Sequence, residues 1–253
     1  MEEEITIEEV KVEVNPLIKE IAEKPSPIGS NSLAPGCGAL LGLKLALQSI
    51  GECVVVTSPG YMTLVYKSIN VPFLCVDNPV AAAAAVSEKY PVMVYADECS
   101  TRRCLQSFLT LKRRNVIYIC YKDQGRSGKS IMLNDIAKNV PSSYSCTASI
   151  SEIEDYIKKL RKAVEKKGLK FVELFAPSPE LMRFDPSNTI EVARMAVETG
   201  IWPLYEKDGK LSFTKKLTKL EPVERYTEML DIKLSEDEIK KLQERAKKIW
   251  QIK

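Results

Sequence analysis

An alternation of short apolar runs with helical stretches, between about Gly36 and Tyr205, constrains the fold of this chain most strongly. The runs are continuously apolar, and this pattern is typical of strands that are buried on both faces of a parallel sheet. Helical stretches between such strands predict an α/β fold with a doubly wound, mostly parallel sheet, in which ligands bind at the carboxyl ends of the strands. The expected strands are Cys53–Thr57, Phe73–Val76, Val92–Ala96, Val116–Tyr121, Tyr144–Thr147 and Phe171–Ala176.

Helical patterns fill the segments between these runs. Ser151-x-x-Glu154 and Ser235-x-x-Glu238 each predict a capping box, in which a serine and a glutamate satisfy backbone amides at the start of a helix. The second box begins a terminal helix. The expected helices inside the domain are Ala39–Ser49, Pro79–Glu88, Thr101–Arg113, Glu152–Lys167 and Ser187–Glu198.

The tail of the chain differs from the part before it. From Lys207 to Lys219 the sequence is polar and poor in strand patterns. We therefore expect three parts: an N-terminal extension over residues 1–30, an α/β domain over residues 31–206, and a helical C-terminal extension over residues 207–253 that packs on the domain or on a partner.

Composition excludes several classes of protein. Apolar residues make up 45% of the chain and charged residues 28%, as in ordinary soluble globular proteins. No apolar run approaches the ~20 residues that span a bilayer, and the acidic start Met1–Glu4 lacks the pattern of a signal peptide. We therefore expect a cytoplasmic protein that binds no membrane. The Lys- and Glu-rich surface is compatible with a thermophilic source.

The net charge of +3 is spread along the chain. The densest basic segments, Lys112–Arg114 and Lys166–Lys167, lie where helices are expected to end, and cations there complement the helix dipole. Because helix ends explain these basic segments, we expect a protein that does not bind nucleic acid.

The chain contains no histidine and seven cysteines. Without histidine, the usual general base, Ser/His triads and most catalytic zinc sites are excluded. The cysteine spacing fits neither a disulfide framework nor a zinc site. Buried free thiols are the expected state, as for Cys53 and Cys120 in strand-like runs.

A polar loop with two glycines follows the strand expected to end at Tyr121. Gly128-Lys129-Ser130 invites a P-loop reading, but the glycine required five positions earlier is Asp123, which argues against a nucleotide site of that type. Backbone amides around Gly125 and Gly128 could still hold an anion. A solvated connection is the alternative reading.

The segment Ala34-Pro-Gly36-Cys37-Gly38 forms a turn directly before an expected helix. Two glycines would let a ligand approach the backbone, and the helix N-terminus favours an anion and a thiol of lowered pKa. The alternative is a glycine-rich helix entry with a buried thiol.

A pair of carboxylates, Asp97 and Glu98, follows the apolar strand that begins at Val92. A carboxylate at the carboxyl end of a strand is well placed to bind Mg²⁺. An aspartate that caps the next helix is the competing interpretation.

The order of these motifs resembles the thiamine-diphosphate-binding β subunit of 2-oxoacid (pyruvate):ferredoxin oxidoreductases. The residues from Ala34 are similar to the family's C-P-G-C-G opening, and the turn at Gly60 to its V-V-x-x-T-G-C strand and turn. The most specific part is Phe175–Glu206, which resembles the family's A-P-C-P, W-R-F, T-I-E-I-A-R and A-V-E-T-G-x-x-P-L-Y-E. Weaker similarities lie at Asn115–Tyr121, Thr147–Ile150 and Leu220–Glu224.

The resemblance implies a thiamine-diphosphate-binding α/β fold and a cofactor site shared with a partner subunit. It implies that thiamine diphosphate and Mg²⁺ lie near Gly36, Cys37, Gly38 and Gly60, with Asp97 as a ligand of Mg²⁺. The loop that contains Asp123, Gly125 and Gly128 would complete this site.

Departures from the family concern the same site. The four cysteines that bind a [4Fe–4S] cluster in the family map to Ala34, Cys37, Tyr61 and Ser178, so we expect no iron–sulfur cluster in this chain. The family's G-D-G motif maps to Ala96-Asp97-Glu98, which brings a carboxylate toward the diphosphate. Its loop asparagine maps to Asp123.

Two functions follow from the resemblance. The chain would support thiamine-diphosphate-dependent decarboxylation of a 2-oxoacid without a cluster of its own. Alternatively, it would be a non-catalytic scaffold that keeps the fold and the partner surface but binds little or no cofactor. Both imply a hetero-oligomer with other subunits of a 2-oxoacid oxidoreductase-like complex.

Overall fold

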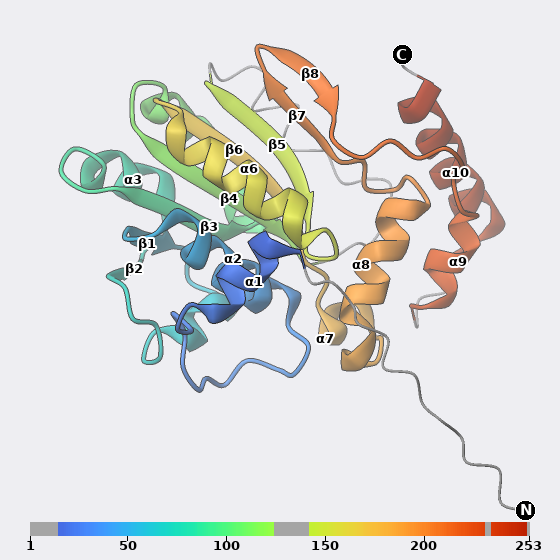
Figure 1. The fold of residues 1–253 in the computed structure, drawn as a ribbon, viewed down its shortest axis with the longest axis horizontal. Helices are drawn as coiled ribbons and strands as arrows, with labels where there is room; N and C mark the ends of the chain where they lie inside the picture. The colour runs from blue at the N-terminus through green and yellow to red at the C-terminus, as the bar shows by residue number, and fades with distance from the viewer. Residues whose placement is uncertain (1–14, 124–141, 231–233, 252–253) are drawn as a thin grey trace, which may run out of the picture.

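The computed structural model describes residues 15–123, 142–230 and 234–251. In this part of the chain, eight strands form one sheet in the order β2-β1-β3-β4-β6-β5-β7-β8 (Figure 1). The first six are parallel to one another, and β7 and β8 are antiparallel additions at one edge. The strands are β1 Val54–Thr57, β2 Phe73–Cys75, β3 Val92–Asp97, β4 Val116–Lys122, β5 Tyr144–Ser149, β6 Leu169–Phe175, β7 Tyr205–Asp208 and β8 Lys210–Phe213.

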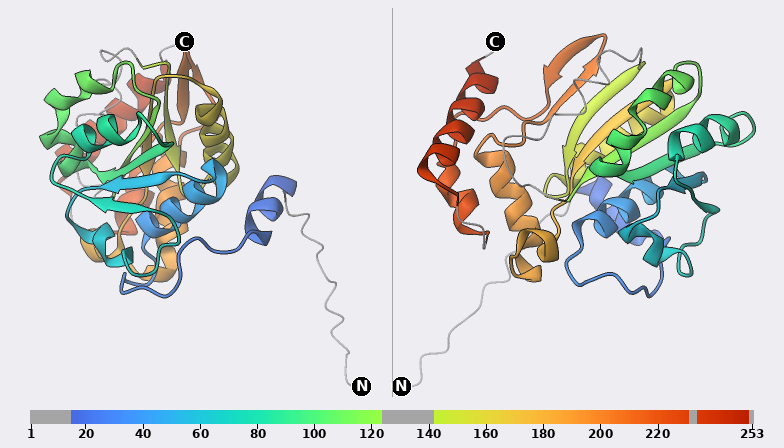
Figure 2. Two further views of the ribbon diagram at one scale, coloured as in Figure 1. Left: turned by 90° about the vertical axis from the view of Figure 1, so that its left-hand side faces the viewer. Right: turned by 180° about the vertical axis from the view of Figure 1, so that it is seen from behind.

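Helices cover both faces of this sheet, as the two views of Figure 2 show. The predicted doubly wound, mostly parallel α/β fold is therefore confirmed. One apolar core lies under α2 and α6, and a second lies under α3 and η2. The α-helices are α1 Pro16–Glu23, α2 Gly38–Ile50, α3 Pro79–Val86, α4 Glu98–Arg103, α6 Ile153–Glu165, α7 Pro179–Met182, α8 Thr189–Glu198, α9 Val223–Glu228 and α10 Glu236–Gln251. The 3₁₀ segments are η1 Tyr61–Val65, η2 Leu105–Leu111 and η3 Pro186–Asn188.

Helix α2 packs very closely on the sheet because it carries Gly42. A Cβ atom at Gly42 would lie 2.4 Å from Cδ2 of Leu174 and 2.8 Å from the hydroxyl of Tyr95. The hydroxyl of Tyr95 also donates a hydrogen bond of 2.6 Å to the carbonyl of Ala39. This contact sets the position of the N-terminal end of α2 at the carboxyl ends of the strands.

The expected helix over Thr101–Arg113 is wrong. The structure has α4 followed by η2, and the interruption lies at Cys104, whose φ of −99° and ψ of 7° are not helical. The helix also begins earlier than expected, because Asp97 caps it.

The expectation that residues 207–219 lack strands is also wrong, because β7 and β8 form a hairpin there. Its turn contains Gly209 with a φ of +74°. The dipeptide Asp208-Gly209 is a hairpin signal that the sequence did contain. The hairpin joins the sheet beside β5, so it spans the predicted domain boundary at residue 206.

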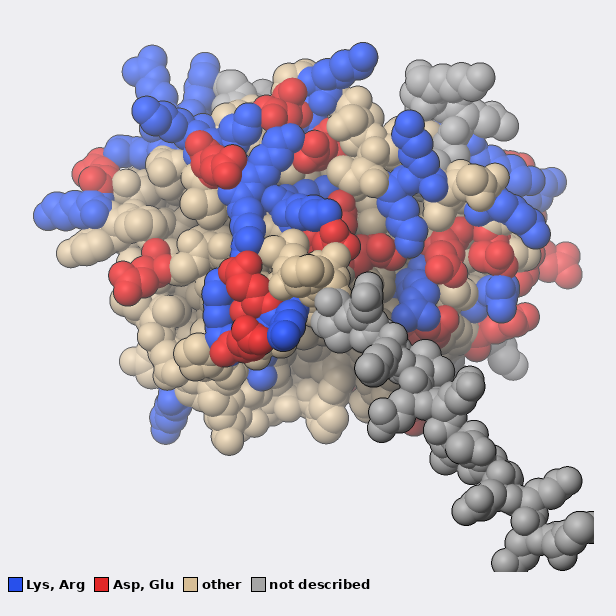
Figure 3. Space-filling view, in the orientation of Figure 1, with Lys and Arg blue, Asp and Glu red and all other residues tan. Residues whose placement is uncertain are grey.

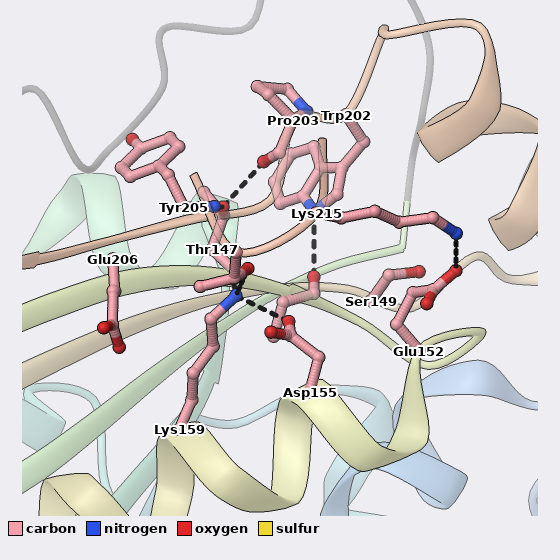
Figure 4. A network of polar contacts seen from close by, with 12 residues as sticks. Thr147, Ser149, Glu152, Asp155, Lys159, Trp202, Pro203, Tyr205, Glu206 and Lys215 are labelled. Carbon is pink, nitrogen blue, oxygen red and sulfur yellow. Dashed lines mark hydrogen bonds and ion pairs between the residues drawn. The ribbon is translucent and has the colours of Figure 1, made fainter. Parts of the chain in front are cut away.

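A polar network fastens this hairpin and the preceding loop to α6 and β5 (Figure 4). The ammonium of Lys159 donates to the Thr147 carbonyl at 2.8 Å, to Asp155 at 2.5 Å and to the Thr214 hydroxyl at 2.8 Å. The indole of Trp202 donates to the Ala148 carbonyl at 2.8 Å. The segment after residue 201 is therefore anchored to the domain by buried polar contacts.

Basic and acidic side chains intermingle on the face seen in Figure 3. Over α6 and β7, Lys162 pairs with Glu206 at 2.9 Å and Lys166 pairs with Asp208 at 2.8 Å. The cations at the end of α6 therefore have acidic partners on the hairpin.

One capping box is confirmed and the other is wrong. The amide of Glu238 donates to the Ser235 hydroxyl at 3.3 Å, and the amide of Ser235 donates to the Glu238 carboxylate at 2.9 Å. The hydroxyl of Ser151 instead shares a hydrogen bond of 2.9 Å with that of Ser149. Helix α6 begins after Glu152, whose side chain makes no cap.

Within the described residues, each helix is too short or too polar to cross a lipid bilayer.

Candidate cofactor-binding site

The carboxyl ends of β1, β3, β4 and β6 meet at one edge of the sheet, and the order of the strands reverses between β1 and β3, since β2 lies on one side of β1 and β3 on the other. Asp97 is the last residue of β3. Gly60 follows β1, and a Cβ atom on it would lie 4.0 Å from the Asp97 carboxylate. The structure therefore brings Gly60 and Asp97 together at the point where doubly wound sheets bind ligands.

Asp97 caps α4 with both carboxylate oxygens. One oxygen accepts from the Ser100 amide at 2.8 Å, and the other accepts from the Ser100 hydroxyl at 2.7 Å. Ser100 in turn accepts a hydrogen bond of 3.1 Å from Arg103. Helix capping is thus the role of Asp97 seen in the structure, and its role as a Mg²⁺ ligand stays a prediction.

Glu98, directly after Asp97, is part of an ion-pair network. The Nε and Nη2 atoms of Arg102 approach one Glu98 oxygen at 3.0 and 2.6 Å. The ammonium of Lys122 lies 3.9 Å from the other oxygen and 3.1 Å from the carboxylate of Glu173. Lys122 is 5% exposed and Glu173 is 0% exposed, so this pair lies in the interior of the domain.

Asp123 follows β4 on the same edge. Burial raises the pKa of its carboxyl to about 6, and the nearby carboxylates of Asp97 and Glu98 act in the same direction. Its carbonyl accepts a hydrogen bond of 3.1 Å from the amide of Ser178. Gly125 and Gly128, predicted from the same loop, lie outside the described residues.

The segment Gly36–Gly38 is explained by packing within the protein. Gly36 has a φ of +70°, and a Cβ atom there would lie 2.5 Å from the Pro186 carbonyl oxygen. A Cβ atom on Gly38 would lie 2.6 Å from the Pro177 carbonyl oxygen. Both glycines therefore allow this turn to contact other backbone segments closely.

Cys37 is the N-cap of α2 and is buried. Its sulfur accepts from the amide of Leu40 at 3.4 Å. Burial raises the pKa of this thiol, against the lowering effect of that amide, and Asp123 and Glu180 add to the increase. Of the two alternatives for this segment, the structure therefore favours a glycine-rich helix entry with a buried thiol. A cavity of about 460 Å³ lies beside the segment, lined by Cys37, Lys44 and Ser187 among others.

The four positions that map to the family's cluster ligands lie around one place. The hydroxyl of Tyr61 accepts a hydrogen bond of 3.0 Å from the Ala34 amide. Burial raises the pKa of the Tyr61 phenol, and the charge of the nearby Cys37 thiolate would act in the same direction. The hydroxyl of Ser178 accepts a hydrogen bond from the Leu181 amide at the start of α7. Ser178 directly follows Pro177, whose carbonyl oxygen lies close to Gly38. Two of the four positions, Ala34 and Tyr61, are thus joined by a direct hydrogen bond.

Sequence reasoning missed Arg102, Glu173 and Trp202, and it treated Lys122 only as the first residue of a loop. Trp202 lies beside Lys122, whose ammonium is 5.4 Å from the centre of the ring. A signal for the network was present in Phe171-Val-Glu173-Leu-Phe175, because a glutamate inside a doubly buried strand requires a cationic or hydrogen-bonded partner.

The described residues fit Mg²⁺ better than they fit a diphosphate. Mg²⁺ binds carboxylate oxygens, and each Asp97 oxygen accepts one hydrogen bond from Ser100 and keeps a second lone pair. A diphosphate needs cations or amides, whereas Arg102 and Lys122 already pair with Glu98 and Glu173.

No protein-family model matches the chain. Named relatives do match it. The pyruvate synthase subunit PorB of Methanothermobacter marburgensis is 31% identical over 242 residues, covering 76% of this chain and 83% of the relative. The ketoisovalerate oxidoreductase subunit VorB of Pyrococcus furiosus is 35% identical over 244 residues, covering 74% and 78%.

A solved structure agrees in fold. A chain of the 2-oxoglutarate:ferredoxin oxidoreductase from Magnetococcus marinus superposes with a TM-score of 0.50 at 14% identity, covering 73% of this chain and 82% of that one. Together with the identity and coverage of the PorB and VorB relatives, the comparisons show that the chain belongs to the family of 2-oxoacid:ferredoxin oxidoreductase β subunits.

Proposed function

We propose that this chain is a non-catalytic β-type subunit of a 2-oxoacid:ferredoxin oxidoreductase-like complex. In this role it keeps the fold and the partner surface of the family, while it holds no iron–sulfur cluster and little or no thiamine diphosphate. The observation that carries the proposal is the contact between Tyr61 and Ala34, because both residues stand where the family resemblance implies cluster cysteines.

Ligand chemistry supports the absence of a cluster. Each iron of a [4Fe–4S] cluster needs a ligand, and thiolates supply it in proteins of this kind. Cys37 is the one cysteine among the four mapped positions, and Ala34, Tyr61 and Ser178 offer no thiol. Burial raises the pKa of Cys37, so its thiolate is also disfavoured.

The charges near Asp97 support weak or absent cofactor binding. Glu98 stands where the family resemblance implies that a diphosphate would approach, and its carboxylate pairs with Arg102 and Lys122. A bound diphosphate would have to displace these ion pairs, which costs free energy unless new contacts compensate.

Association with other subunits is part of the proposal. The relatives PorB and VorB are named as subunits of pyruvate synthase and ketoisovalerate oxidoreductase. We propose that this chain likewise assembles with different subunits, as a scaffold within such a complex.

A second function is favoured by one observation, the position of Gly60 beside Asp97 at the switch point of the sheet, where a Cβ atom on Gly60 would lie 4.0 Å from the Asp97 carboxylate. In this alternative, the chain would support decarboxylation of a 2-oxoacid in a site completed by a partner. Asp97 and Asp123 would hold Mg²⁺ there, and Asp97 could keep its hydrogen bonds to Ser100, because each of its oxygens accepts one bond and retains a second lone pair.

Three measurements on the full chain test the proposal. Iron and acid-labile sulfide are assayed after anaerobic purification, and we expect neither in stoichiometric amount. Calorimetric titration with thiamine diphosphate and Mg²⁺ is expected to give no binding, and affinity purification from native extract is expected to recover other subunits. Four irons per chain, or tight binding of thiamine diphosphate, would refute the scaffold. A lone monomer with decarboxylase activity would refute the assembly.

A further inference from the structure

The carboxylate of Glu98 sits between two cations that come from different elements. Arg102 lies one turn further along α4 and approaches through two nitrogens, at 3.0 and 2.6 Å. Lys122 comes from the end of β4 and lies 3.9 Å from the second oxygen. The side chains of Glu98 and Lys122 are 17% and 5% exposed, whereas Arg102 is 40% exposed and reaches the solvent.

The Lys122 ammonium cannot move together with the Glu98 side chain, because it also pairs with the buried carboxylate of Glu173 at 3.1 Å. The ammonium is therefore fixed at the carboxyl end of β4. A fixed ammonium and a guanidinium that face one oxyanion are the groups with which proteins bind phosphate. In this chain the oxyanion between them is a side chain.

We propose that Glu98 is a built-in anion that occupies a phosphate-binding cradle formed by Arg102 and Lys122. This inference rests on the proposed function, since it names what closes the site to a diphosphate. Removing the carboxylate opens the cradle to inorganic pyrophosphate with Mg²⁺, the simplest ligand of the diphosphate class.

The neighbouring charges explain why a dication is included in the test. Glu173 neutralises part of the charge on Lys122, and the carboxylates of Asp97 and Asp123 lie nearby. With Glu98 removed, Arg102 loses its carboxylate partner in the cradle. Mg²⁺ bridges carboxylate and phosphate oxygens, so it reduces the repulsion between the ligand and the two aspartates.

The experiment compares wild type with Glu98→Gly and Glu98→Gln by calorimetric titration with pyrophosphate and Mg²⁺. Glu98→Gln keeps the size of the side chain and guards against misfolding caused by glycine in α4. Circular dichroism confirms the fold of each variant. We expect both variants to bind pyrophosphate at least roughly tenfold more tightly than wild type, because one like charge within the cradle is removed. Added salt should weaken this binding.

Two further variants locate the effect. Glu221→Gly removes a carboxylate that pairs with an arginine four residues later, at 2.7 Å, but in the segment before α9. It should leave pyrophosphate affinity at the wild-type level. Adding Arg102→Ala to Glu98→Gln should abolish the gain.

Equal pyrophosphate affinity of wild type and folded Glu98 variants would overturn the inference. So would a gain that persists in Glu98→Gln/Arg102→Ala, because the anion would then bind elsewhere. The proposed function is judged separately, by iron content, by subunit recovery and by thiamine diphosphate binding to wild type. Pyrophosphate carries no thiamine, so the two failures are distinguishable.

Discussion

The hydroxyl of Tyr61 accepts a hydrogen bond of 3.0 Å from the backbone amide of Ala34. This bond joins the turn after β1 to the turn before α2, and the buried thiol of Cys37 lies beside it. A protein side chain therefore links two loops at the place where the family resemblance implies a metal cluster.

Tyr61→Phe should lower the free energy of unfolding by about 1 kcal/mol, because the amide of Ala34 loses its partner while the ring is kept. Urea denaturation measures the loss. Tyr66→Phe is the matched control, since Tyr66 is an exposed residue of the same region and should show no change. No loss in Tyr61→Phe, or an equal loss in both variants, would contradict a specific stabilising role of the Tyr61 hydroxyl.

Lys122→Met should lower the free energy of unfolding by about 3–5 kcal/mol, because the variant removes the ammonium that pairs with the buried carboxylate of Glu173 at 3.1 Å. The double variant Lys122→Met/Glu173→Met should recover most of this loss, since two apolar side chains then replace the pair. Thermal unfolding compares them, with Lys158→Met as the control for an exposed lysine. Losses that simply add in the double variant would show that the two charges are not coupled.

Asp123→Asn should stabilise the protein at neutral pH. Burial raises the pKa of the Asp123 carboxyl to about 6 in the fold, above its ordinary value of 3.8. The folded state therefore binds the proton more tightly, and stability falls as the pH rises between about 4 and 6.

An asparagine carries no charge, so Asp123→Asn should gain up to about 3 kcal/mol above pH 7 and almost nothing at pH 4. Urea denaturation at several pH values gives both numbers. A gain that is independent of pH would show that the carboxyl of Asp123 titrates normally.

Gly42→Ala should destabilise the fold by about 1–3 kcal/mol, although alanine is the better helix former. The added methyl group would lie 2.4 Å from Leu174 and 2.8 Å from Tyr95. Gly29→Ala is the control, because a Cβ atom there meets the Ser68 carbonyl at an ordinary 3.7 Å. If thermal unfolding finds Gly42→Ala as stable as wild type, then α2 can move away from the sheet at little cost.

Local patterns were sufficient to predict most strands and the fold class. Strand β4, Val116–Lys122, is buried along its length and is apolar up to Tyr121, and the mostly apolar strand β6, Leu169–Phe175, is buried along its length too. The turn signal Asp208-Gly209 was also local, and the hairpin there could have been predicted from it. Helix α4 was misplaced because its start depends on a contact between Asp97 and Ser100, and sequence allowed either role for that aspartate.

The sequence by itself determined the doubly wound sheet, because burial on both faces demands continuous apolar strands. It also led to the expectation that this chain binds no iron–sulfur cluster, since one cysteine remains at the four mapped positions. Only the tertiary structure decided which charges meet. Strand β6 inserts between β4 and β5 in the sheet, and this order brings Glu173 beside Lys122. Such a pairing depends on distances between strands far apart in the chain, and no local pattern records them.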